Sequence, residues 1–193
     1  MALYNKIKPI LASITLLYYP GYLLAEVPLS QGTTEFSATI LEGSCDWTWN
    51  ETQLDFLPVT VDRIKSGTAL EIKPLAAAIQ CTQALTPQLK ITGSTPFTDN
   101  GKVFLDAPVT RNVGFMLQVD DGRQQTPSLG SFFSDGMAGK AIENNVPINV
   151  APVTQANQSV EQIIWVGLVG MNSNNPTETG TFSTTLIFTG LIP

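Results

Sequence analysis

The chain has 193 residues, a formal net charge of −6 and a pI of about 4.5. Its ten basic residues are scattered singly, which argues against nucleic-acid binding because phosphate backbones are bound by clustered Lys and Arg. Hydrophobic residues make up 43% and charged residues 13% of the sequence, which predicts one folded domain with a sizeable core rather than a disordered chain.

Residues 1–25 have the features of a signal peptide. Lys6 and Lys8 form a positively charged N-terminal region, the apolar stretch 10–17 follows, and signal peptidase could cleave after Ala25. A membrane anchor is the alternative interpretation, but this stretch is far shorter than the roughly 20 residues that a spanning helix needs. We therefore expect export through the periplasm.

The two cysteines, Cys45 and Cys81, are expected to form a disulfide. An exported protein meets an oxidising compartment, where an isolated pair of cysteines usually becomes bonded. A disulfide that closes the loop between these two cysteines would stabilise the folded protein by roughly 3–4 kcal/mol in the chain-entropy model. A metal site is disfavoured, since the sequence has no histidine to complete a set of ligands with two thiols.

From residue 32 onward, β-branched and aromatic residues are frequent and turn-forming residues recur at short intervals, which is typical of strands and turns. Segment 69–81 is interpreted as a strand bent at Pro74, although 76–78 alone would also allow a helix. The turn Asp120-Asp121-Gly122 ends one strand, 96–101 is expected to close a hairpin, and 124–145 to be a long loop. The strand-like segments are 32–42, 54–61, 69–81, 90–92, 102–105, 113–119, 146–153, 163–171 and 180–192.

About seven strands among these nine segments, at this spacing, indicate a β-sandwich. The last strand alternates, with Ser183, Thr185 and Ile187 on one face. Taken alone, it is typical of any half-buried strand of a sandwich. The opposite face carries Phe182, Thr184, Leu186, Phe188, Gly190 and Ile192.

The two ends of the chain resemble chaperone–usher pilins of the type 1 and P pilus kind. In that family a glycine stands fourteenth from the end, as Gly180 does here, and alternating apolar residues lead to a penultimate aromatic, where this chain has Ile192. Near the start, Gly32 precedes an alternating strand that leads into the first cysteine, and the second cysteine ends a strand. Segment 113–122 resembles the strand and turn of the family.

The resemblance implies an all-β fold, an incomplete immunoglobulin-like β-sandwich completed by donor-strand complementation. It divides the chain into a signal peptide at 1–25, an N-terminal donor-strand extension at 26–38 and a pilin domain at 39–193. The C-terminal strand would border an open groove that first binds the chaperone, through Gly180, Phe182, Thr184, Leu186, Phe188, Gly190 and Ile192. Phe36 would be the main anchor of the extension, worth roughly 2–3 kcal/mol when buried. Gly32 would suit a shallow point of the groove, or alternatively act as a hinge. The donor residues are Ser30, Gly32, Thr34, Phe36 and Ala38.

The implied partners are a periplasmic pilus chaperone, an outer-membrane usher and neighbouring pilin subunits, and the location is the cell-surface fimbrium. Ser30 would fill the last pocket weakly and Pro28 lacks an N–H, which favours a minor or adaptor subunit. Contact with a host glycan would occur through the assembled fibre.

Other functions receive less support from the sequence. Without histidine, and without a nucleophile motif or a phosphate-binding glycine loop, no enzyme, cofactor or metal is expected. A carbohydrate-binding adhesin is the main alternative, because Trp47, Trp49 and Trp165 have faces that stack on sugars, although core or groove packing is favoured for the first two. A pilus-terminating subunit is a further alternative.

Overall fold

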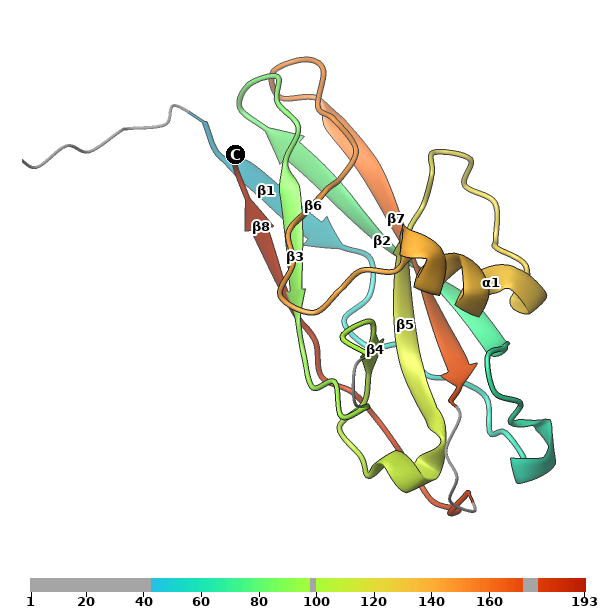
Figure 1. Ribbon diagram of the computed structural model, residues 1–193. Helices are drawn as coiled ribbons and strands as arrows, with labels where there is room; N and C mark the ends of the chain where they lie inside the picture. The colour runs from blue at the N-terminus through green and yellow to red at the C-terminus, as the bar shows by residue number, and fades with distance from the viewer. Residues whose placement is uncertain (1–42, 98–99, 172–176) are drawn as a thin grey trace, which may run out of the picture. The chain divides into compact units, whose positions relative to one another are not determined.

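The described part of the chain forms two antiparallel sheets. The computed structural model describes residues 43–97, 100–171 and 177–193, within the compact unit Leu41–Pro193. A five-stranded sheet has the order β1-β2-β7-β5-β4, and a three-stranded sheet has the order β6-β3-β8 (Figure 1). The strands are β1 (Cys45–Trp49), β2 (Ala69–Cys81), β3 (Gln88–Thr92), β4 (Val103–Phe104), β5 (Val113–Val119), β6 (Ile148–Asn149), β7 (Ser159–Gly170) and β8 (Ile187–Leu191).

Short helical segments lie between some of these strands. They are η1 (Val61–Arg63), η2 (Val109–Arg111), α1 (Leu129–Asp135) and the π-helical turn η3 (Gly136–Lys140). Among the described residues, no helix is both long and apolar enough to span a membrane. The predicted signal peptide, the donor-strand extension, the strand 32–42 and the turn 172–176 lie outside the described residues.

The main core lies between the two sheets. The second half of β2 alternates in burial, whereas β5 and most of β7 are buried on both faces, and all three strands direct one set of side chains toward β3 and β8. Because successive side chains of an extended strand point to opposite faces of the sheet, residues two apart share a face. The most completely buried side chains of the main core include Ile79, Leu89, Ile91, Leu117, Ile164 and Leu168.

Strand β2 continues through Pro74, as predicted. The pairing of β1 with β2 ends at Trp49 and Ala77, so that Pro74 stands beyond the last paired residue of β1. On its other edge β2 pairs with β7, where Pro74 lies opposite Trp165. A proline is tolerated in a strand where the missing N–H faces an edge without a ladder, and the departure of β1 provides that edge.

The turn after β5 is built as the sequence predicted. One carboxylate oxygen of Asp120 accepts hydrogen bonds from the backbone N–H groups of Gly122 at 2.8 Å and Gln124 at 3.0 Å. The other oxygen accepts from the indole Nε1 of Trp165 at 2.9 Å. Burial raises the pKa of Asp120, but these three hydrogen bonds outweigh it and hold the pKa below its ordinary value.

Four sequence predictions were wrong in detail. Segment 96–101 is not a hairpin, because β3 pairs with β6 and β8 whereas β4 pairs with β5 in the other sheet, so this loop crosses between sheets. Segment 146–153 is reduced to β6 and an isolated bridge at Val153. The third error is shared by segments 54–61 and 180–186, which form no ladder with any described residue.

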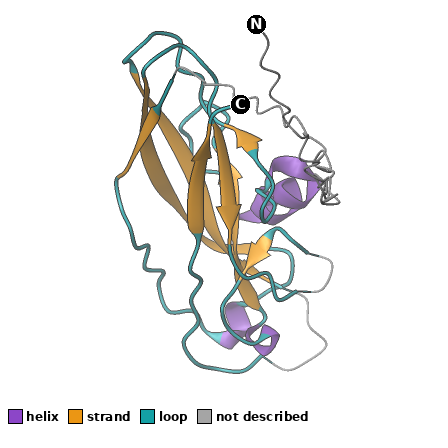
Figure 2. Ribbon diagram, turned by 90° about the vertical axis from the view of Figure 1, so that its left-hand side faces the viewer, coloured by secondary structure: helices purple, strands orange, loops and turns teal. Residues whose placement is uncertain are grey.

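The fourth error is the loop predicted for 124–145, which contains α1 and η3. This helical segment covers the outer face of the five-stranded sheet, away from the main core (Figures 1 and 2). Phe132 of α1 is fully buried there, in a second cluster with Met116 and Trp165. The helix begins at Ser128, whose hydroxyl accepts a hydrogen bond from the N–H of Gly130 at 3.3 Å.

Candidate functional site: an open groove

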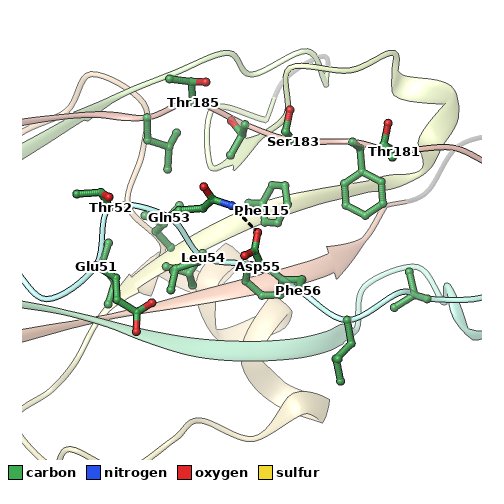
Figure 3. Close-up of a pocket in the computed structure, with 18 of the residues that line it drawn as sticks. Glu51, Thr52, Gln53, Leu54, Asp55, Phe56, Phe115, Thr181, Ser183 and Thr185 are labelled. Atoms are coloured by element: carbon green, nitrogen blue, oxygen red, sulfur yellow. Dashed lines mark hydrogen bonds between the residues drawn. The ribbon is translucent and has the colours of Figure 1, made fainter.

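A groove opens between the two segments that form no ladder. Its cavity volume is about 800 Å³, and residues 51–59 form one wall while residues 180–186, continuing to Phe188, form the other (Figure 3). We call these the first wall and the second wall. The floor consists of four apolar side chains from the inner face of the five-stranded sheet: Leu75, Phe115, Leu117 and Val166.

The first wall is attached to β2 by side chains instead of a backbone ladder. The N–H of Leu57 donates to the Glu71 carboxylate at 2.8 Å, and Lys73 Nζ donates to the carbonyl oxygen of Asp55. Since alternate residues of an extended chain direct their backbone groups to opposite edges, those of Leu54 and Phe56 face the groove. Among the described residues, no hydrogen bond involves these groove-facing groups.

The second wall is attached on one edge by one backbone and one side-chain hydrogen bond. The carbonyl of Ser183 accepts from the N–H of Asp106 at 2.9 Å, and the N–H of Thr185 donates to the Asp106 carboxylate at 2.6 Å. The backbone groups of Phe182, Thr184 and Leu186 therefore point to the opposite edge, toward the groove. Within the described ranges they too have no hydrogen-bonding partner. Two unpaired strand edges thus face each other across an apolar floor.

Three aromatic rings cross the groove. The ring of Phe115 on the floor lies 5.3 Å from that of Phe56 on the first wall and 5.9 Å from that of Phe182 on the second wall, measured between centroids. Each pair is tilted, which is a favourable arrangement for phenyl rings. These contacts hold both walls against the floor where neither has a backbone partner.

Trp49 lines one end of the groove, and Trp47 packs beside it. The ring of Trp49 lies 4.6 Å from that of Phe188 and 6.2 Å from that of Trp47. A Cβ placed on Gly190 would lie 2.4 Å from Trp47 Nε1, so glycine allows this tryptophan to pack directly on β8. Both tryptophans are half-buried, and core packing, which the sequence favoured for them, is confirmed.

The disulfide predicted from the sequence is present. Cys45 and Cys81 face each other at the start of β1 and the end of β2, with their Cα atoms 4.1 Å apart and a sequence separation of 36. The bond fixes β1 to β2 near the point where the N-terminal part of the chain joins the fold. No cluster of three or more potential metal-binding side chains occurs within the described residues.

No protein-family model matches the sequence, and no curated protein matches it. Solved structures do match the fold. A chain from the structure of a chaperone–usher pilus aligns with a TM-score of 0.55 at 12% identity, over 86% of this chain and 98% of that one. The P pilus rod subunit PapA aligns with a TM-score of 0.53 at 12% identity, over 77% of this chain and 99% of its own.

This chain has the fold of a chaperone–usher pilin. The resemblance stated from the sequence is confirmed at the level of the fold, and so is the incomplete immunoglobulin-like sandwich. In this pilin fold the groove lies where a further strand would complete the sandwich, between two edges that have no partner among the described residues.

The pilin fold places some of the predicted site residues together and leaves others apart. Gly180, Phe182, Thr184, Leu186 and Phe188 all line the groove, and the alternation predicted for them is observed. Gly190 and Ile192 do not line it. The five donor residues at 30–38 lie outside the described residues, so their role stays a prediction.

Sequence reasoning missed the first wall and the floor. The signal for the first wall was present, since Leu54 and Phe56 alternate with polar residues, but this segment was assigned to an ordinary strand. The floor residue Phe115 was placed in the correct strand, although nothing in a single sequence shows which strands lie beneath an opening.

Proposed function

We propose that this chain is a structural subunit of a chaperone–usher surface pilus that polymerises by donor-strand exchange. The open groove is the observation that supports this proposal. Unpaired edges and apolar side chains that face solvent are an aggregation hazard, which proteins normally cover. A strand inserted between the walls supplies backbone hydrogen bonds to both edges and apolar side chains to the floor.

The occupant that polymerises the fibre is the N-terminal extension of a neighbouring subunit. The extension of this chain, 26–38, is longer than either wall and alternates in the same way as a strand. Residues Gly32, Thr34 and Phe36 face the floor of the neighbour's groove, and Phe36 is the anchor. Before assembly, a periplasmic chaperone occupies the groove, and exchange takes place at the outer-membrane usher.

The subunit occupies a minor or adaptor position in a fimbrium on the cell surface and contributes to adhesion through the assembled fibre. Ser30 and Pro28 support this position, because they make the first part of the extension a weak donor. The tryptophans give little support to sugar binding by the subunit itself. Trp165 is 5% exposed and donates its indole hydrogen bond to Asp120.

A strand-exchange assay tests the proposal. The purified chain, held by its chaperone, is mixed with a synthetic peptide of residues 26–40, and chaperone release and the melting temperature are followed. We expect the peptide to displace the chaperone and to raise the melting temperature sharply, whereas a peptide carrying Phe36→Asp does neither. A folded subunit that accepts neither peptide would contradict donor-strand exchange into this groove.

A further inference from the structure

The outward-facing side of the first wall carries uncompensated negative charge. Glu51, Gln53 and Asp55 are exposed along this wall, next to the opening of the groove (Figure 3). The Asp55 carboxylate accepts a hydrogen bond from Gln53 Nε2 at 2.8 Å (Figure 3). Among the described residues, neither Glu51 nor Asp55 forms a salt bridge.

The cations closest to the groove are engaged by other groups. Lys73 Nζ lies 3.4 Å from the Glu71 carboxylate and 5.5 Å from the centre of the Phe56 ring, and it donates to a backbone carbonyl of the first wall. Arg111 lies at the far end, where it donates to the carbonyl of Thr179 and lines a small cavity together with Glu178. The negative charges of Glu51 and Asp55 are therefore not neutralised by these cations.

The outward-facing side of the second wall is neutral. Thr181, Ser183 and Thr185 are exposed there and present hydroxyl groups (Figure 3). A strand in the groove would direct every second side chain outward, between carboxylates on one side and hydroxyls on the other. Opposite charges on neighbouring strands stabilise a sheet and like charges destabilise it, so this rim favours an occupant with Lys or Arg on its outward face.

The chain's own extension carries an acidic residue, not a basic one, on its outward face. If Gly32, Thr34 and Phe36 face the floor, the outward residues include Glu35, adjacent to the anchor. The sequence contains no Lys or Arg between Lys8 and Arg63, so no basic residue of the extension offsets this glutamate. A second copy of this chain would bring its acidic strand to an acidic rim.

We infer that the groove is filled in the fibre by the extension of a different pilin, one with a basic residue on its outward face, and that Glu51 and Asp55 disfavour a second copy of this chain. The inference rests on the proposed function, which it deepens by naming the chemistry of the neighbour. A subunit that discriminates against itself joins unlike neighbours instead of forming long homopolymers.

The test is a charge-swap experiment on the purified chain with fluorescent peptides of residues 26–40. One peptide is unmodified, the second carries Glu35→Gln and the third Glu35→Lys, and their dissociation constants are measured at low and high salt. We expect the Glu35→Lys peptide to bind about three- to tenfold more tightly than the unmodified peptide at low salt, a difference typical of exposed charge pairs. High salt should remove most of this difference because it screens exposed charges.

Two variants of the chain complete the design. Asp55→Lys should reverse the order of the peptides, whereas Asp62→Asn, which removes an exposed carboxylate away from the groove, should leave the order unchanged. Equal binding of the unmodified and the Glu35→Lys peptides, or a preference that Asp55→Lys does not alter, overturns the inference and leaves the proposed function intact. Failure of all three peptides to bind the folded chain overturns both.

Discussion

Gly167 of β7 lies directly beneath the ring of Phe132, close enough that a Cβ on Gly167 would be 2.2 Å from Phe132 Cε1. The ring is fully buried in this position and attaches α1 to the outer face of the five-stranded sheet. No other residue type fits at 167 without displacement of the ring.

Gly167→Ala should therefore destabilise the protein by about 1–3 kcal/mol, the usual cost of overpacking a core. Urea denaturation followed by tryptophan fluorescence measures the change. The matched control is Gly130→Ala in α1, where the nearest atom would be 3.8 Å away, and alanine is expected to be neutral or slightly stabilising. Equal stability of the two variants would show that Phe132 moves aside without cost.

Replacement of both cysteines by serine should lower the free energy of unfolding by about 3–4 kcal/mol, from the entropy of the loop that the disulfide closes. Cys81 is fully buried, so a serine hydroxyl at this position adds a further cost. Thermal denaturation with and without a reductant measures the effect. The reductant should destabilise the unmodified chain and leave the double variant unchanged; a double variant as stable as the unmodified chain would contradict a stabilising role.

The lowered pKa of Asp120 predicts a loss of stability at acidic pH. A carboxylate whose pKa is lower in the folded state stabilises the protein above the pKa of the unfolded state, which is 3.8 in a model compound, and this contribution is lost as the pH falls through the folded-state pKa. Asp120→Asn should consequently be less stable than the unmodified chain at neutral pH, and the difference should shrink below about pH 4. A constant difference across this range of pH would argue against the linkage.

Thr184→Val should stabilise the empty subunit by about 1 kcal/mol or more. The Thr184 hydroxyl oxygen is buried and has no hydrogen-bonding partner among the described residues, and valine has nearly the same shape without this cost. The exposed neighbour Thr185 provides the control, since Thr185→Val buries no additional apolar surface. A destabilised Thr184→Val variant would mean that the hydroxyl is satisfied by water.

Phe36→Asp should give a subunit that folds and binds its chaperone but does not polymerise. An aspartate directed at an apolar floor loses the burial of the ring, worth about 2–3 kcal/mol, and also brings a charge out of water. Electron microscopy of assembled fibres provides the measurement, with Ser37→Asp on the outward face as the control. Normal fibres from the Phe36→Asp variant would refute the register proposed for the extension.

The features that could be predicted from the sequence are those that depend on local pattern. The alternation of Phe182, Thr184 and Leu186 identified their inner face correctly, and Asp120 formed the predicted turn. The helix α1 was missed although Leu129, Phe132 and Phe133 have helical spacing, because the segment is only seven residues long and contains a glycine and two serines. It is held by the contact between Phe132 and Gly167, which the sequence does not reveal.

The groove itself was only partly predictable. The C-terminal wall was identified through its resemblance to pilins, but the first wall was mistaken for an ordinary paired strand because its alternation is the same whether or not a partner is present. Likewise, turn residues at 96–101 indicated a reversal of the chain without showing that β3 and β4 belong to different sheets. Pairing depends on long-range contacts that a local pattern does not specify.

Pro74 affects whether another strand can pair with the free edge of β2. It interrupts the row of N–H donors along the edge of β2 that β1 leaves uncovered, next to the first wall. A strand that approached this edge would lack a hydrogen bond at its centre, whereas one that enters between the two walls finds groove-facing backbone groups on both sides. Pro74 thus makes this edge of β2 a poorer template for pairing than the two edges of the groove.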